Sequence, residues 1–249
     1  MSRLGLLVGW LLLAAPALAR LPRIALVIDD IGLRRDALDP LLAIPALHGK
    51  VTYAVIPGTP FATAMTRELC AAGEPLIAHL PMEPSDPREM TPTLAPYLRR
   101  GQEPDAIVRA IRARLDALPE DARACLQGAS NHQGSGFTED ASAMRAALAA
   151  LSKAGLYFLD SRTSSRSVAI ATARRLGMPH AARDVFLDHE RRVASIALQL
   201  DRALRVAQAR GVAIAIGHPY PETAEALAAW LVKTKGQLEL VALETVLSR

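Results

Sequence analysis

Acidic and imidazole side chains follow most of the short apolar runs in this sequence, at the point where each run ends. These side chains are Asp29, Asp30, His79, His132, Asp160, Asp188 and His218. If the runs are parallel strands separated by helices, their carboxyl ends meet on one face of the fold, where active sites are built. Taken singly, each Asp could be a helix N-cap and each His a half-buried side chain with its hydrogen bonds satisfied. Taken together, they predict one site.

Three of these side chains have the chemistry of a metal site. Asp30 offers a hard oxygen ligand, and His79 and His132 offer imidazole nitrogens. This set suits Zn²⁺ or a related divalent ion with a coordination position left open for water. Such an ion lowers the pKa of the bound water towards about 7. We expect Asp29 to take a proton from that water and His218 to protonate a leaving group.

The apolar runs that must position these residues lack the alternation of a half-exposed strand. They cover residues 24–28, 51–56, 76–78, 156–159, 185–187 and 212–216, with weaker candidates near 126–131 and 238–241. Continuous apolar character over a strand's length indicates burial on both faces, as in a parallel sheet covered by helices.

Helical patterns fill the intervals between these runs. They cover residues 61–72, 104–118, 139–154, 191–210 and 221–233, and a glycine follows several of them before the next apolar run. Strand and helix therefore alternate nearly throughout. We count about seven or eight such units, more than a small open sheet requires, which favours a distorted (β/α) barrel within the α/β class.

The longest irregular stretch is proline-rich and covers residues 81–103. A segment of that length inside a compact domain is usually functional or disordered. Nothing else in the sequence has the composition of a linker between domains. We therefore expect residues 20–249 to form one domain.

The first 19 residues have the pattern of a secretory signal peptide. Arg3 precedes the apolar run 4–15, and Ala17 and Ala19 supply a small-residue cleavage site. The alternative is a retained membrane anchor, but the run is shorter than the roughly 20 residues that a spanning helix needs. We expect an exported protein, periplasmic or extracellular, with no membrane span after cleavage.

The composition argues against nucleic acid as a partner. The net charge is only +4, and aromatic residues make up 4% of the chain. The basic residues are scattered along predicted helices, as on solvated helix faces, and few aromatic side chains are available to stack on bases.

The remaining cysteines and histidines carry weaker expectations. Cys70 and Cys125 could form a disulfide in an oxidising compartment, but we favour two separate, buried small apolar side chains. His48 and His180 are expected to be structural or solvated. His189 follows Asp188 at the predicted site end of a strand and is a weak candidate for a supporting contact.

Six ordered segments surround the candidate residues. They are 28–32 (IDDIG), 78–84 (AHLPMEP), 131–135 (NHQGS), 158–163 (FLDSRT), 183–188 (RDVFLD) and 217–223 (GHPYPET). These segments resemble the signature segments of the divergent polysaccharide deacetylase family. The resemblance covers nearly all of the chain after residue 19, and it implies a distorted β/α barrel related to the carbohydrate esterase deacetylases.

The resemblance also implies roles for individual residues. Asp29 would be the base, Asp30 and His79 would bind the metal, and His218 would protonate the leaving group. Asp160 and Arg162 would support catalysis, and Arg183, Asp188 and Tyr220 would contact the substrate.

One motif departs from the family pattern. Typical deacetylases carry two metal-binding histidines four residues apart, whereas this chain has His79 and then Glu83. The third ligand is therefore either His132 or Glu83. We favour His132 because it lies at a predicted strand end, whereas Glu83 begins the proline-rich segment and could instead anchor that loop.

Two functions follow from these observations. The first is an exported, metal-dependent hydrolase that removes N- or O-acetyl groups from a cell-envelope polysaccharide or aminosugar polymer, with Zn²⁺ as the expected ion. The second is a non-catalytic envelope protein that keeps the fold and binds a glycan or a protein partner, because a fold does not by itself secure a function.

Overall fold

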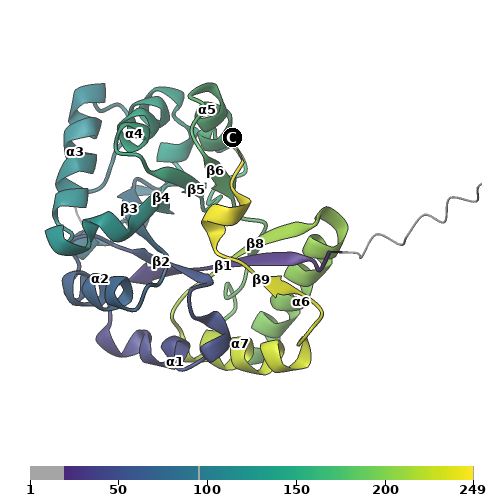
Figure 1. Ribbon diagram of the computed structural model, residues 1–249. Coiled ribbons are helices and arrows are strands. Elements are labelled where there is room, and N and C mark those ends of the chain that lie inside the picture. Colours follow the sequence, from purple (N-terminus) through teal and green to yellow (C-terminus); the bar gives the residue numbers. More distant parts are fainter. Residues whose placement is uncertain (1–19, 95, 249) are drawn as a thin grey trace, which may run out of the picture.

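The structure, a computed structural model, describes residues 20–94 and 96–248 (Figure 1). Within these ranges the chain forms nine strands and seven α-helices. The strands are β1 (Arg23–Ile31), β2 (Val51–Val55), β3 (Leu76–Met82), β4 (Leu126–Gln133), β5 (Tyr157–Asp160), β6 (His180–Ala182), β7 (Val185–Phe186), β8 (Val212–Gly217) and β9 (Glu239–Leu240). The helices are α1 (Asp39–Leu42), α2 (Ala62–Ala71), α3 (Pro104–Asp116), α4 (Ala141–Lys153), α5 (Ala169–Arg175), α6 (Val193–Arg210) and α7 (Pro221–Lys233).

All strand pairs are parallel, and the two edges of the sheet come together. The order is β6-β5-β4-β3-β2-β1-β8-β7, with β9 paired to the start of β1. β6 pairs with β5 and β7 pairs with β8, yet only Arg183 and Asp184 separate β6 from β7 in the chain. One extended segment thus joins both edges, so the sheet must curl, with helices around it (Figure 1). The predicted distorted barrel is confirmed.

Apolar side chains are buried on both faces of the sheet, as the continuous apolar runs predicted. Ile24 and Leu26 of β1 belong to the large cluster between the sheet and the helices. Ala25 and Val27 of the same strand belong to the smaller cluster inside the barrel, to which the C-terminal segment adds Leu243. Side chains therefore fill the barrel, and the strand ends are left to build a site.

Three short elements lie outside the predicted ranges: α1, α5 and β6. β6 has three residues because it is only the first half of the segment that joins the sheet edges. Runs this short carry too few residues for a periodicity to be read from the sequence.

The proline-rich segment is ordered around a buried arginine. Arg114 of α3 donates hydrogen bonds to the carbonyl oxygens of Leu94 and Pro96 in this segment and of Pro57 after β2. Near the end of the segment, Leu98 donates its backbone N–H to the carbonyl of Pro81, the first residue of the segment. The segment is thereby fixed beside the carboxyl ends of β2 and β3.

The expected signal peptide, residues 1–19, lies outside the described residues and stays a prediction. In the ranges that the structure describes, no helix is both long enough and apolar enough to span a bilayer.

Cys70 and Cys125 form a disulfide, so the expectation of two separate side chains was wrong. Their Cα atoms lie 5.8 Å apart, within the range that a disulfide bridges. Cys70 lies near the end of α2, which leads into β3, and Cys125 directly precedes β4. Because β3 and β4 pair side by side, the two cysteines are brought together across 55 residues of sequence.

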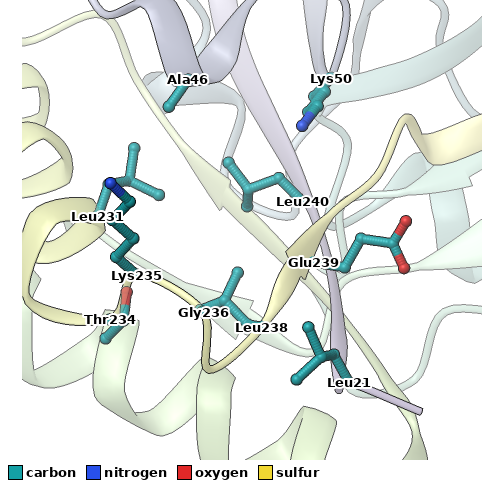
Figure 2. A pocket seen from close by; sticks show the side chains of 10 residues that line it. All are labelled: Leu21, Ala46, Lys50, Leu231, Thr234, Lys235, Gly236, Leu238, Glu239 and Leu240. Carbon is teal, nitrogen blue, oxygen red and sulfur yellow. The ribbon is translucent and has the colours of Figure 1, made fainter.

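The end of the barrel where β1 begins contains a pocket of about 350 Å³. Figure 2 shows its lining, in which Leu21, Leu231 and Leu240 stand beside Lys50 and Lys235. No histidine, cysteine or aspartate is among the residues that line it. The groups suited to metal or acid–base chemistry instead lie at the opposite end, where the strands finish.

Replacing Cys70 and Cys125 together by alanine should lower the free energy of unfolding by roughly 4 kcal/mol, because the link restricts a long loop in the unfolded chain. Urea unfolding followed by circular dichroism measures this difference. As a control, the double variant should unfold at the same urea concentration with and without reductant. A wild-type protein whose midpoint is unmoved by reductant would contradict the stabilising role.

Candidate functional site

Asp29 and Asp30 lie at an irregularity near the end of β1. Between the residues that pair Ile28 and Ile31 with β2, β1 contains one residue more than its partner strand, which makes a bulge. Asp30 there has φ of 61°, in the left-handed region that non-glycine residues seldom adopt. Adjacent side chains of a regular strand point to opposite faces. The bulge instead lets both carboxylates approach the same ring, that of His79.

Asp30, His79 and His132 come together from β1, β3 and β4. His132 Nδ1 lies 2.8 Å from Asp30 Oδ1, and His79 Nε2 lies 3.3 Å from the same oxygen. One ligand atom from each residue lies within 4.8 Å of the others. On its far side, His79 Nδ1 is 2.7 Å from Ser130 Oγ, a contact that holds the ring with Nε2 towards the cluster. The structure thus assembles the three residues predicted to bind metal.

The two neighbouring carboxylates differ in their protonation. Burial acts to raise the pKa of Asp30, but hydrogen bonds from His132 and His79 outweigh it and hold this pKa well below its usual value. Burial raises the pKa of Asp29, and the nearby imidazoles offset only part of that effect. Asp30 is therefore held as an anion, while Asp29 binds a proton more readily than an ordinary aspartate.

Asp29 has an oxygen atom without a hydrogen-bond partner. Its side chain is 5% exposed, and Oδ2 lies 3.6 Å from His79 Nε2. Among the described residues, nothing donates a hydrogen bond to the buried Oδ1. A buried carboxylate oxygen left in this way costs free energy unless a ligand or a proton satisfies it. Asp29 Oδ1 is thus a buried acceptor whose hydrogen-bonding capacity is not used by the described residues.

The donor set fits a divalent cation. A carboxylate and two imidazoles are the ligands of many catalytic zinc sites, which leave a position free for water or substrate. Here the carboxylate of Asp30 is held ionised in a half-enclosed position, and the unpartnered oxygen of Asp29 lies beside it. A positive ion would compensate this buried negative charge.

His218 stands on the other side of Asp30, held by a buried aspartate. Its Nδ1 lies 2.8 Å from Asp188 Oδ1, and its Nε2 lies 3.7 Å from Asp30 Oδ2. Thr223 donates a 2.8 Å hydrogen bond to the second oxygen of Asp188. Burial acts to lower the pKa of His218, but the hydrogen bond to Asp188 and the charges of Asp30, Asp188 and Asp29 raise it to about 9.

Asp188 is placed behind His218 and not beside a bound ligand. Its side chain has 0% exposure, and its two oxygens are taken up by His218 and Thr223. The expected contact of Asp188 with substrate stays a prediction, and in this structure both carboxylate oxygens already have partners. From this position it fixes the orientation of the His218 ring.

Glu83 is not part of the cluster. Its carboxylate accepts a 2.8 Å hydrogen bond from the backbone N–H of Arg100, and the Arg100 side chain lies 3.5 Å away. Its backbone also bonds Leu98 on one side and Gly136 on the other. Glu83 therefore anchors the proline-rich segment, whereas His132 lies within the cluster that could hold an ion.

Asp160, Arg162 and Arg183 form a second set that borders the cluster. Asp160 accepts hydrogen bonds from the backbone N–H of Arg162 and from the hydroxyl of Ser167, both at 2.8 Å. Arg183 donates to the carbonyl oxygens of Ser161 and Arg162 at 2.6 and 2.9 Å. Asp160 is buried, and these hydrogen bonds fix the turn that follows β5. The Arg162 side chain is exposed.

Of the remaining residues considered from the sequence, Tyr220 contacts His218 and His189 contacts Phe186, whereas His48 and His180 make contacts elsewhere. The Tyr220 ring stacks on His218 with centroids 5.4 Å apart, and the Arg191 guanidinium lies 3.8 Å from the Tyr220 centroid. His189 is exposed beside Phe186. As expected, the other two histidines are structural. His180 is buried with Nδ1 bonded to Met178, and His48 pairs with the buried Glu74.

Ser130, Thr223 and Phe186 support the site but were not identified from the sequence. Ser130 is the β4 residue directly opposite His79 of β3, so its role depends on the register of two strands. Thr223 lies in the first turn of α7 and reaches a strand end 35 residues away. Phe186 packs edge-on against His218 at 5.3 Å between ring centroids. No local pattern signals such contacts, because each joins separate elements.

Solved structures share this fold. An uncharacterized protein of Agrobacterium tumefaciens is 24% identical with a TM-score of 0.79, covering 92% of this chain and 91% of that one. A family 4 acetyl xylan esterase of Clostridium thermocellum, in complex with cobalt, is 15% identical with a TM-score of 0.52 over 90% of this chain and 89% of its own. A CE4 family pseudoenzyme of Bacillus anthracis is 16% identical with a TM-score of 0.52, and the match covers 90% of this chain and 65% of that one.

Two curated relatives are more similar in sequence. The uncharacterized protein YibQ of Escherichia coli is 33% identical over 96% of this chain and 70% of its own length. An uncharacterized protein of Haemophilus influenzae is 34% identical over 88% of this chain and 74% of its own. The family model described as divergent polysaccharide deacetylase matches residues 26–247. Since this range contains every segment on which the resemblance was based, the chain belongs to the divergent polysaccharide deacetylase family.

Proposed function

We propose that this protein is a metal-dependent hydrolase that removes acetyl groups from a cell-envelope polysaccharide or aminosugar. The observation that carries the proposal is the position of Asp29. Its buried, unpartnered Oδ1 lies next to a three-residue ligand cluster, with the ring of His218 on the other side of Asp30. A base, a metal site and an acid in one cluster are groups that can catalyse acyl transfer to water.

The metal in this proposal is bound by Asp30, His79 and His132, and the ligand set favours Zn²⁺. The ion would polarise the acetyl carbonyl and make water a stronger nucleophile. Ser130 keeps His79 in the orientation that offers Nε2. The bulge and left-handed backbone of Asp30 keep its carboxylate between the two imidazoles.

Asp29 acts as the general base. Its raised pKa makes it a better proton acceptor than an ordinary aspartate, and its free oxygen can receive a hydrogen bond from water. The oxygen of that water forms a bond to the acetyl carbon while Asp29 takes the proton. The carbon–nitrogen or carbon–oxygen bond to the sugar then breaks.

His218 acts as the general acid that protonates the departing amine or hydroxyl. With a pKa of about 9, it carries a proton at neutral pH. The hydrogen bond from Nδ1 to Asp188 leaves Nε2 facing the cluster, so the proton to be transferred is on the correct nitrogen. Asp188 is a positioning residue in this scheme, and Tyr220 and Arg183 flank the space where a sugar would lie.

Export to the periplasm or the extracellular space is part of this proposal. The Cys70–Cys125 disulfide is typical of proteins from oxidising compartments. The sequence pattern of residues 1–19 independently points to secretion. A glycan of the cell envelope is then the polymer that the protein meets.

A second candidate is a non-catalytic protein that binds glycan through the same site. The spacing of the histidines departs from the usual deacetylase motif, and a CE4 family pseudoenzyme has the same fold. The two candidates differ in whether acetate is released.

Asp29→Asn should lower kcat/KM for acetate release at least about 100-fold, because the amide cannot accept the proton from water. The assay is acetate release from acetylated aminosugar oligomers by Zn²⁺-loaded or Co²⁺-loaded protein. Metal content measured by elemental analysis is the control and should not change, since Asp29 is outside the ligand set. Wild-type protein that releases no acetate from any such oligomer would favour the binding protein instead.

His132→Ala should weaken Zn²⁺ binding at least about 100-fold, because it removes one of three ligands. Glu83→Gln is the matched comparison and should leave the Zn²⁺ dissociation constant within a few-fold of wild type. Titration calorimetry measures both constants, and thermal unfolding checks that each variant is folded. If Glu83→Gln weakened Zn²⁺ binding and His132→Ala did not, the third ligand would be Glu83 and not His132.

A further inference from the structure

A second pocket, of about 510 Å³, lies beside the proposed active site. It is formed by the segment around β7 and by one face of α6. Ser195, Gln199 and Arg202 of α6 line it at intervals of four and three residues, which places them on the same side of the helix. Its volume is in the range of small-ligand pockets.

The acidic side chains of this pocket are already paired. Asp184 binds Arg210 at 2.7 Å and accepts the backbone N–H of Ile214 at 2.9 Å. Glu190 pairs with Arg192 and accepts a 2.6 Å hydrogen bond from Ser195. Their negative charges are therefore compensated outside the pocket.

The basic side chains of the pocket are not paired in this way. In the part of the chain that the structure describes, no carboxylate lies within 4.0 Å of a guanidinium nitrogen of Arg183 or Arg202. The hydrogen bonds of Arg183 go to the backbone carbonyls of Ser161 and Arg162, which carry no formal charge. Burial lowers the pKa of Arg183 and the charge of Arg162 acts in the same direction, while the carboxylates of Asp29 and Asp160 offset part of this effect. Asp184 and Glu190 are paired with arginines that do not line the pocket, so, within the described ranges, the guanidinium groups of Arg183 and Arg202 are the charges of its lining that lack a carboxylate partner.

The pocket shares a wall with the site. The Phe186 ring contacts His218 at 5.3 Å between centroids, and the Arg183 guanidinium lies 4.9 Å from the centre of that ring. Phe186 and exposed His189 both line the pocket. The pocket and His218 therefore lie on either side of the Phe186 ring.

We propose that this pocket binds an anionic group, a carboxylate or a phosphate, carried by the sugar next to the one that is deacetylated. This inference rests on the proposed function and gives the substrate a class, that of acidic, acetylated glycans. Guanidinium groups bind planar carboxylates and phosphates through paired N–H donors, which ammonium groups cannot do. The unpaired charges of Arg183 and Arg202 supply those donors.

The test measures dissociation constants by titration calorimetry with Zn²⁺-loaded full-length mature protein. One probe is a tetrasaccharide of alternating N-acetylglucosamine and glucuronic acid, and its neutral counterpart has the carboxylates reduced to hydroxymethyl groups. A second probe is a tetrasaccharide of N-acetylglucosamine with 6-phosphates, compared with the unphosphorylated tetrasaccharide. At least one acidic probe should bind about fivefold more tightly than its neutral counterpart.

Arg202→Gln should abolish this preference for the acidic probe. Arg205→Gln removes the same charge from the next turn of α6, outside the pocket lining, and should preserve the preference. Arg202→Lys should preserve part of it. A preference for the carboxylate or for the phosphate alone identifies which anion is bound. The inference would be overturned if each acidic probe bound with the same dissociation constant as its neutral counterpart. It would also be overturned if Arg202→Gln and Arg205→Gln reduced the preference for the acidic probe equally.

Acetate release on the same probes separates this inference from the proposed function. An acidic preference that depends on Arg202, without acetate release, supports the anion pocket and removes the hydrolase proposal. Acetate release from neutral and acidic probes alike, with equal affinities, supports the hydrolase and overturns the anion pocket.

Discussion

The whole site depends on the bulge at the end of β1. A regular strand would send Asp29 and Asp30 to opposite faces, one into the barrel and the other towards the helices. One additional residue and a left-handed backbone at Asp30 bring both carboxylates to His79. A left-handed aspartate costs free energy, which the surrounding hydrogen bonds of its carboxylate must offset. Gly32, two residues after Asp30, has φ of 108°, and a Cβ atom at this position would lie 2.4 Å from Thr59 Oγ1. The backbone that follows the bulge therefore requires glycine at this position.

The same geometry gives three titratable groups different tendencies to bind a proton. Hydrogen bonds from two imidazoles keep Asp30 ionised, whereas Asp29 is buried without a partner for one oxygen. His218 keeps its proton because Asp188 is behind it and two further carboxylates are in front. One cluster thus places an ionised carboxylate, a carboxylate with a raised pKa and a protonated imidazole close together, and the surroundings of each group set its charge.

The barrel supports this arrangement by closing on itself. The segment that contains β6 and β7 pairs first with β5 and then with β8, and so it brings Asp160 and Asp188 to the same end of the fold as Asp30. Within this closing segment, Arg183 also ties the loop after β5 to the site through the carbonyls of Ser161 and Arg162. The pairing of β7 with β8 therefore also positions Phe186 between His218 and the neighbouring pocket.

The sequence by itself determined the α/β class, most strands and the longer helices, because burial on both faces leaves a continuous apolar run that is readable locally. It also indicated Asp30, His79 and His132, since parallel strands end on one face. Only the tertiary structure decided that Glu83 bonds Arg100, that Asp188 lies behind His218 and that Cys70 meets Cys125. Each of these outcomes depends on the register and curvature of the sheet. They arise from contacts between residues distant in the chain, which no local pattern records.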